Sequence, residues 1–440
     1  MTMKKINRRQ FIQGSGLITL SGLGGLQLGM AGQLLGANGG PQRDLLVYVF
    51  LNGAMDGLHM VPPRSGADYQ EYRNILRPNL SIPASESLPL NGQNAFGLHP
   101  AAVELADLFN RNKMAIVHAT GLSQSNRSHF EATKYMELGA QDLGATAGTG
   151  WLTRYFQSSL HTPENALIPS VVPGDGNSAA FLGDPTALAV NDPSDFTMAN
   201  GHWTWGNAQA ETLNRLYENP NRPEATVGHQ ALYTSQVIQS IDWDNYQPGN
   251  NSVYPDTQLG EQLKTVAQLY RSDVGLEVAY VPTGGWDTHD GQSYRFDNLA
   301  AELSAALAAF YEDLHAHHSG RFTVVVQSEF GRRAYQNSAN STDHGYGNPM
   351  FILGDTVNPG FHGQFPGLAQ HQLFEGGDVN VTTDYRDVIS EILMKRMRNR
   401  FLGYIFPDYS NYSPLNIVQG EDMAPVFEAD YDPLFASGFE

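Results

Sequence analysis

Residues 45–51 read LLVYVFL and are followed by NGAMDG at residues 52–57. An unbroken apolar run of this length predicts a β-strand buried on both faces, which is typical of a central strand in a parallel sheet. The Asn-Gly pair marks the turn at which this strand ends. Asp56 follows that turn, so a carboxylate is expected near the carboxyl end of a buried strand.

The same pattern recurs along the chain, where short apolar runs alternate with stretches of helical period. Further strands are predicted at residues 114–118, 167–172, 276–281, 322–327 and 350–353, and helices at residues 99–110, 128–138, 297–315 and 384–397. Strands that alternate with helices predict an α/β fold with a mainly parallel sheet and helices on both of its faces. The α/β domain is expected to span residues 44–406.

Two other segments have a different composition. Residues 175–271 are rich in Asn, Gln, Tyr and Trp and are expected to form a helical cap inserted into the α/β domain. Residues 407–440 show no clear periodicity and end in several acidic residues, so we expect an acidic C-terminal extension there.

The N-terminal segment has the layout of an export signal. Lys4, Lys5, Arg8 and Arg9 precede an uncharged, mildly apolar stretch, and residues 7–12 (NRRQFI) resemble a twin-arginine signal. We expect residues 1–37 to engage the twin-arginine export machinery and to be removed. The mature protein would then be periplasmic or extracellular and would have no membrane span. The alternative is a membrane anchor, but frequent glycines lower the hydrophobicity of this stretch.

Composition excludes several classes of function. The chain has 440 residues and a formal net charge of −19. It contains no cysteine, which excludes disulfide bonds, thiolate metal sites, iron–sulfur clusters and cysteine nucleophiles. The acidic balance also argues against nucleic acid as a partner, because phosphate contacts need basic surfaces.

Oxygen and nitrogen donors follow several of the predicted strands, and these positions suggest a metal site. The residues concerned are Asp56, Asp287, His289, Glu329 and His344. In open α/β sheets, ligands bind outside the carboxyl ends of the strands. Carboxylate and imidazole donors suit a divalent metal such as zinc, manganese, magnesium or calcium. The alternative is that these residues cap helices and tie loops together.

The segment around Ser128 allows two interpretations. Residues 128–131 (SHFE) match a capping box at the start of a helix. A serine at a helix N-terminus is also well placed as a nucleophile, and Arg127 beside it is a candidate for holding an anionic group. His129 is a possible substrate-binding residue, metal ligand or base, and Arg332 is a possible site for an anionic substrate.

Taken together, these segments resemble the secreted bacterial family called domain of unknown function 1501. The resemblance covers about residues 44–406. It rests on the twin-arginine start and on LNGAMDGLHMVPP (51–63), SNRSHFEA (125–132), GWDTH (285–289), SEFGRR (328–333), TDHGYGN (342–348) and TTDYRDV (382–388). That family is similar in fold to the alkaline phosphatase/sulfatase superfamily, whose members use two metal sites and a nucleophile at a helix N-terminus.

The resemblance implies a role for each of the donor residues. Asp56 matches the first metal-binding aspartate, Asp287 and His289 match a metal-binding pair, and Glu329 matches an acidic ligand. His344 matches a late histidine ligand, and Ser128 matches the nucleophile.

Two functions therefore follow from the sequence. The first is an exported metal-dependent hydrolase of phosphate or sulfate esters. The alternative is a non-catalytic periplasmic or surface protein that binds a polymer or a partner, because Glu329-Phe330 stands where the phosphatases have an Asp-His pair. A third hypothesis is a mutase or transferase of the same superfamily.

Overall fold

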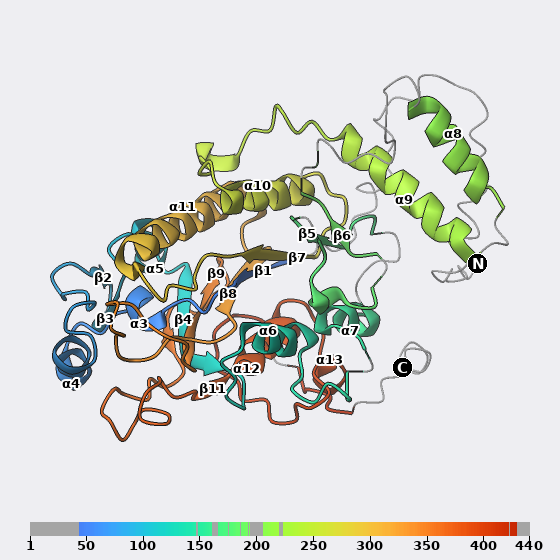
Figure 1. The fold of residues 1–440 in the computed structure, drawn as a ribbon. Coiled ribbons are helices and arrows are strands. Elements are labelled where there is room, and N and C mark those ends of the chain that lie inside the picture. The colour runs from blue at the N-terminus through green and yellow to red at the C-terminus, as the bar shows by residue number, and fades with distance from the viewer. Residues whose placement is uncertain are drawn as a thin grey trace.

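The computed structural model describes residues 44–428 except 147, 161–165, 175, 185, 192, 194–205, 220–222 and 422. The expected signal at residues 1–37 lies outside these residues. The described chain forms an α/β fold around one mixed, mostly parallel sheet (Figure 1). The strands of this sheet are β1 (Leu45–Leu51), β4 (Met114–Gly121), β5 (Ser170–Val172), β6 (Leu188–Ala189), β7 (Val278–Thr283), β8 (Phe322–Ser328), β9 (Asn348–Leu353), β10 (Gly360–His362) and β11 (Thr383–Asp384).

The strand order places β1 in the interior of the sheet. The order is β10-β4-β9-β8-β1-β7-β5-β6, with β11 also paired to β4. Only β9, among the described strands of this sheet, is antiparallel to its neighbours, β4 and β8. All seven residues of β1 are buried, and Val47 pairs with Ala279 of β7 and Val324 of β8. The buried central strand predicted at residues 45–51 is confirmed with those bounds.

Helices cover both faces of the sheet, as predicted (Figure 1). Because side chains alternate along a strand, Val47 and Val49 of β1 join one apolar cluster and Tyr48 and Phe50 join the other. The first cluster is completed by α5 (Val103–Asn110), α10 (Gln258–Arg271) and α11 (Gln292–His318). The second is completed by α6 (His129–Leu138), α7 (Trp151–Ser158), α12 (Tyr385–Lys395) and α13 (Leu402–Ile405).

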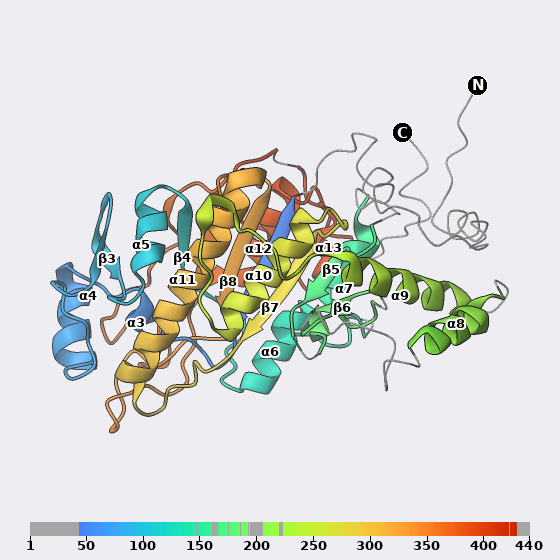
Figure 2. The same ribbon diagram turned by 90° about the horizontal axis from the view of Figure 1, so that it is seen from above.

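Smaller elements flank the β4 side of the body. They are α3 (Gly57–Met60), α4 (Gly66–Gln70), the π-helical turn η2 (Glu71–Leu76) and the hairpin of β2 (Leu88–Leu90) and β3 (Gln93–Leu98). Figure 2 shows α4 and β3 at one end of the molecule and α8 and α9 at the other.

The described part of residues 175–271 contributes to the main body as well as to a projection. It holds the 3-10 turns η3 (Ala179–Phe181) and η6 (Gly249–Asn251), and it adds β6 to the sheet. Helix α10 packs against α11 and β7. Only α8 (Gly206–Tyr217) and α9 (Pro223–Ser240), which pack on each other, project from the body (Figures 1 and 2). The segment therefore differs from a purely helical cap.

The start of the C-terminal extension is anchored by one buried carboxylate. Glu391 on α12 accepts hydrogen bonds from four successive backbone N–H groups at residues 415–418 and from the Lys395 ammonium. Ile417 and Val418 are buried against the layer that contains α12. No described helix is both long and apolar enough to cross a membrane.

His118 on β4 gives the fold a predicted dependence on pH. Its ring stacks on Phe361 with centroids 4.7 Å apart, and burial lowers its pKa from 6.5 to about 4. Below pH 6.5 the unfolded chain therefore binds a proton that the folded chain does not. The associated stability is fully present above this pH and is lost as the pH falls toward 4.

We expect wild-type protein to lose about 2 kcal/mol of unfolding free energy through His118 between pH 7.5 and pH 5. His118→Phe keeps an aromatic ring and removes the titrating group, so its loss over this interval should be smaller by that amount. Urea unfolding at the two pH values measures the difference. Equal losses in the two proteins would show that His118 is not the titrating group.

Candidate metal centre

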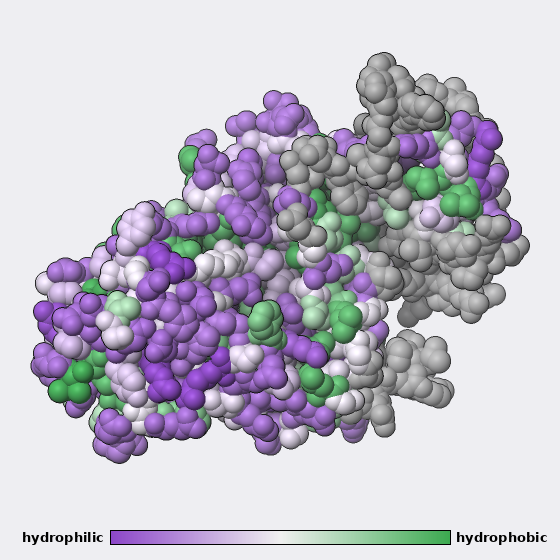
Figure 3. Space-filling view, viewed as in Figure 1, coloured by the Kyte–Doolittle hydropathy of each residue, from purple (hydrophilic) through white to green (hydrophobic). Residues whose placement is uncertain are grey.

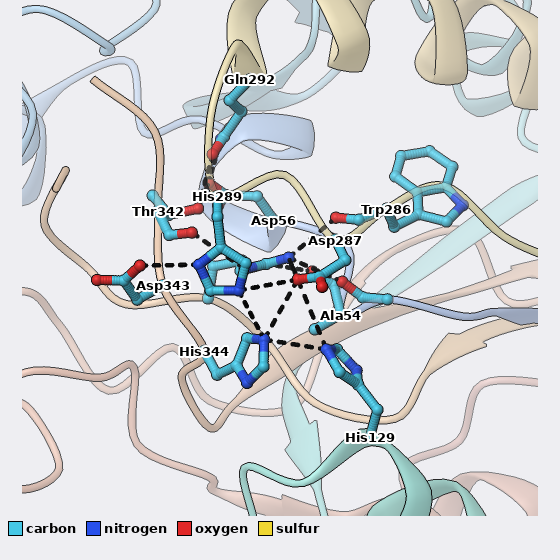
Figure 4. Close-up of polar contacts among 12 residues, drawn as sticks. Ala54, Asp56, His129, Trp286, Asp287, His289, Gln292, Thr342, Asp343 and His344 are labelled. Carbon is cyan, nitrogen blue, oxygen red and sulfur yellow. Dashed lines mark hydrogen bonds and ion pairs between the residues drawn. The ribbon is translucent and has the colours of Figure 1, made fainter. Parts of the chain in front are cut away.

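Four of the predicted donor side chains meet at the carboxyl end of the sheet (Figure 4). His129 is the first residue of α6, Asp287 and His289 lie in the loop after β7, and His344 lies in the loop between β8 and β9. One ligand atom from each of His129, Asp287 and His344 lies within 4.8 Å of the other two. His289 extends this group on the side opposite His129 (Figure 4).

The imidazole Nε2 atoms point at one another. His344 Nε2 lies 2.9 Å from His129 Nε2 and 2.8 Å from His289 Nε2. Asp287 Oδ1 lies 3.2 Å from His344 Nε2, 3.0 Å from His289 Nε2 and 3.5 Å from His129 Nε2. We call these four side chains, His129, Asp287, His289 and His344, the metal cluster.

The other ring nitrogen of each histidine has a fixed acceptor. His129 Nδ1 lies 2.6 Å from Glu329 Oε1, and His289 Nδ1 lies 2.8 Å from Asp343 Oδ1. His344 Nδ1 lies 2.9 Å from the backbone carbonyl of Arg127. Because carboxylates and carbonyls only accept, each ring carries a proton on Nδ1, so that in the neutral imidazole Nε2 is the nitrogen with the free lone pair.

This proton arrangement fits a metal ion. In the neutral imidazoles, three Nε2 lone pairs and one carboxylate oxygen face one another, and a cation between them would remove their repulsion. Histidine ligands whose second nitrogen donates to a carboxylate or a carbonyl are typical of metal sites. Nitrogen and carboxylate donors at about 2.0–2.2 Å suit zinc, for which tetrahedral ligands stand roughly 3.3 Å apart. The separations between Asp287 Oδ1 and the three Nε2 atoms, 3.0–3.5 Å, lie around that value, whereas the two separations between Nε2 atoms, 2.8 and 2.9 Å, are shorter.

The charge of the surroundings also matches a divalent ion. Asp287, Glu329 and Asp343 bring three negative charges, and the guanidinium of Arg332 beside Asp287 brings one positive charge. Burial raises the pKa of Asp287, but hydrogen bonding and the charge of Arg332 outweigh it, so the pKa is lowered and the carboxylate stays ionised. The net charge of −2 is neutralised by one divalent cation.

The guanidinium of Arg332 is occupied by hydrogen bonds within the protein. Its side chain is buried and donates to the carbonyls of Gly53, Ala54 and Thr342 at 2.8–3.0 Å, as well as to Asp287 Oδ1. The structure therefore uses Arg332, which the sequence placed as a substrate-binding residue, to hold Asp287 and the loop after β1.

Glu329 holds one imidazole of the cluster through a hydrogen bond. Its buried carboxylate accepts from the backbone N–H of Gly53 at 2.8 Å and from His129 Nδ1. The hydrogen bond from His129 to Glu329 raises the pKa of His129, while burial lowers the pKa of His344. In the described structure this carboxylate, which the resemblance implies as a metal ligand, accepts a hydrogen bond from the imidazole of His129.

Asp56 lies apart from the cluster and is occupied by other partners. The buried guanidinium of Arg77 donates to both of its oxygens at 2.8 and 3.0 Å, and Gln292 Nε2 donates at 2.6 Å. Burial raises the pKa of Asp56, but the charge of Arg77 outweighs it and lowers the pKa. The structure therefore does not bring Asp56 together with the three histidines.

Ser128 and Arg127 stand directly before α6. Ser128 is the N-cap residue, but its side chain makes no capping hydrogen bond, and Glu131 instead accepts from Asn126 Nδ2 at 3.0 Å. The capping box is therefore not formed. The guanidinium of Arg127, placed in the sequence as an anion-binding group, pairs with Asp378 and Glu375 at 2.8–2.9 Å.

An open cleft leads to the cluster. Its volume is about 490 Å³. The floor includes His129, Asp287 and Glu329, one wall is formed by α6, and the other by the loops after β1 and β7. The lining residues on these walls are Asn52, Gly53, Phe130, Thr133, Lys134, Glu137, Gly284 and Gly285.

Two residues of the site were not assigned from the sequence. Asp343 orients His289, and its position directly before His344 in the Gly-rich loop was a usable signal. Phe330 stacks on the ring of His129, with centroids 5.0 Å apart, and no local pattern indicated this contact.

Comparison with known families is consistent with the resemblance found in the sequence. Residues 197–399 match the family model described as protein of unknown function (DUF1501). This stretch is less than half of the chain and contains Asp287, His289, Glu329 and His344, so the similarity supports a relation to a family of unknown function. No curated protein matches the chain.

The cluster predicts a zinc affinity that depends on its supporting shell. His344→Ala removes the central nitrogen and should weaken zinc binding by at least 100-fold. Glu329→Gln keeps the size of the side chain but weakens the hold on His129, so we expect a loss of about 10- to 100-fold. Competition with a chelating dye at pH 7.5 measures both.

His317→Ala is the matched control, because His317 is exposed at the end of α11 and far from the cluster in sequence. Its zinc affinity should equal that of the wild type. Unchanged affinity in His344→Ala would exclude the cluster as the zinc site.

Proposed function

We propose that this protein is a metal-dependent hydrolase of phosphate or sulfate esters. The observation that carries the proposal is the convergence of three Nε2 atoms and Asp287 Oδ1 beside an open cleft that His129 and Asp287 line. Perturbed titratable groups that meet in a cleft are the usual mark of a functional site. The resemblance to the alkaline phosphatase/sulfatase superfamily supplies the class of ester.

The chain's own residues take complementary roles in this reaction. Asp287 and the three histidines bind the ion, and Glu329, Asp343 and the Arg127 carbonyl keep the histidine protons on Nδ1. A divalent ion held there polarises the ester and lowers the pKa of a nearby hydroxyl group or water molecule. Ser128 stands beside His129 with its hydroxyl unused by the helix cap, and it is the proposed nucleophile.

The site is proposed to hold one metal ion rather than two. Arg77 neutralises Asp56 and takes both of its oxygens, so that carboxylate serves the fold. Phe330 occupies the position where the phosphatases have a histidine, and its ring packs on His129. With a single ion, the backbone N–H groups at the start of α6 become the other proposed support for an anionic ester.

The pairing of Asp56 with Arg77 and the presence of Phe330 in place of a histidine also favour the second candidate, a non-catalytic binding protein on this fold. Such a protein would keep the metal cluster and the cleft but would not turn over esters. Export by the twin-arginine route, with a periplasmic or extracellular location, belongs to both candidates and rests on residues 1–37 of the sequence alone.

The activity test uses protein purified without chelators and loaded with zinc or manganese. We expect hydrolysis of phenyl phosphate or phenyl sulfate, and His344→Ala should abolish it. Ser128→Ala should lower kcat by at least 100-fold if Ser128 is the nucleophile, because the attacking atom is removed. The control is again His317→Ala, which should keep full activity.

The outcomes separate the candidates. If His344→Ala abolishes activity while Ser128→Ala preserves it, water is the nucleophile. If every metal-loaded form binds zinc but hydrolyses neither ester, the hydrolase proposal fails and the binding protein is favoured.

A further inference from the structure

One face of α6 lines the cleft that also contains His129 and Asp287 of the metal cluster. Phe130, Thr133, Lys134 and Glu137 all line the cleft, and their spacing of three, four and seven residues places them on one side of a helix. Phe130 is 90% exposed although it adjoins His129 in the sequence. The structure thus presents an exposed aromatic ring in the lining of the cleft that His129 and Asp287 also line.

On the side of the loop after β7, the cleft is lined by two residues without side chains, Gly284 and Gly285. Gly284 has open space where a Cβ atom would lie, with no atom within 4 Å. Gly285 has a φ of +96°, in the region that favours glycine. Gly284 therefore adds no side chain to the cleft that it lines together with α6.

Lys134 is a cationic side chain in the lining of the cleft, and it forms no ion pair with any described residue. Among the described residues no ion pair or other interaction involves Lys134. By contrast, Arg127 is paired with Asp378 and Glu375, and Arg332 is saturated by carbonyls and Asp287. Glu137, one turn beyond Lys134, accepts hydrogen bonds from the hydroxyls of Tyr280 and Ser178 at 2.7–2.8 Å.

We propose that the cleft binds the non-reacting part of the substrate, a planar apolar ring that packs on Phe130 and carries an anionic substituent that binds Lys134. The substrate class is therefore an aryl ester with a second negative group. A ring on an exposed aromatic side chain gains both apolar burial and favourable stacking. The inference rests on the proposed function only for the position of the reacting ester.

Binding is tested with phosphonates, which cannot be hydrolysed at the carbon–phosphorus bond. The probes are methylphosphonate, phenylphosphonate and 4-carboxyphenylphosphonate, titrated into the protein by calorimetry with and without zinc. We expect the phenyl compound to bind at least 10-fold tighter than the methyl compound. The additional carboxylate should tighten binding by a further 3- to 10-fold at low ionic strength.

Two substitutions assign these gains to residues. Phe130→Ala should remove the preference for the phenyl ring, and Phe130→Leu should keep part of it. Lys134→Gln should remove the gain from the carboxylate and leave the phenyl preference intact. Tyr233→Ala on α9 and Lys264→Gln on α10 are matched controls, because both residues lie outside the cleft. Unchanged zinc affinity in each variant shows that the cluster is intact.

The result that overturns the inference is a phenyl preference that is absent in the wild type or that survives Phe130→Ala. This failure is distinct from failure of the proposed function. Phe130-dependent binding without turnover of any ester supports the inference and removes the hydrolase. Turnover of phenyl phosphate that is indifferent to Phe130→Ala supports the hydrolase and removes the inference.

Discussion

The position of three protons determines what this site is able to do. Each imidazole of the cluster donates its Nδ1 proton to an acceptor that the fold holds in place, namely Glu329, Asp343 or the Arg127 carbonyl. Without those acceptors the rings would be free to bond to one another through Nε2, and the cluster would be a set of ordinary histidine contacts. With them, the neutral rings turn their Nε2 lone pairs toward a common point, which is the arrangement typical of histidine ligands around a metal ion.

The sheet fixes those acceptors in space. Glu329 follows β8, and its carboxylate is held by the backbone N–H of Gly53, which follows the neighbouring strand β1. Arg332, three residues beyond Glu329, reaches the carbonyls after β1 and the carboxylate after β7. The parallel arrangement of β7, β1 and β8 therefore brings the ends of three distant segments together, and the same buried strands that form the core set the geometry of the site.

Much of the fold could be predicted from the sequence, because apolar runs and helical periods are local signals. The strand at residues 45–51 has the predicted bounds, and the helix predicted at residues 297–315 exists as part of α11. That helix starts earlier, at Gln292, whose buried side chain donates to Asp56 Oδ2 and accepts from the Thr342 hydroxyl. The antiparallel direction of β9 and the strand order depend on long-range pairing, which no local pattern encodes.

The site was predictable as a set of donor residues but not as a set of roles. Asp287, His289 and His344 meet as the sequence indicated, and His129 joins them. Glu329 and Arg332 contact the cluster through His129 and Asp287, respectively. Asp56 binds Arg77 instead, because the partner of a carboxylate is often distant in sequence. A motif indicates the residue type at a strand end, whereas the partner that each carboxylate binds is set by residues distant in sequence, such as Arg77 for Asp56 and Arg332 for Asp287.

The central claim is that the described histidines surround one cation, and crystals grown with zinc test it most directly. Anomalous diffraction collected at the zinc absorption edge should show one strong peak bounded by Asp287 Oδ1 and the Nε2 atoms of His129, His289 and His344, at about 2.0–2.2 Å from each. The claim is contradicted if the zinc peak lies elsewhere on the molecule, or if the three side chains keep their present contacts in zinc-saturated crystals with no peak between them.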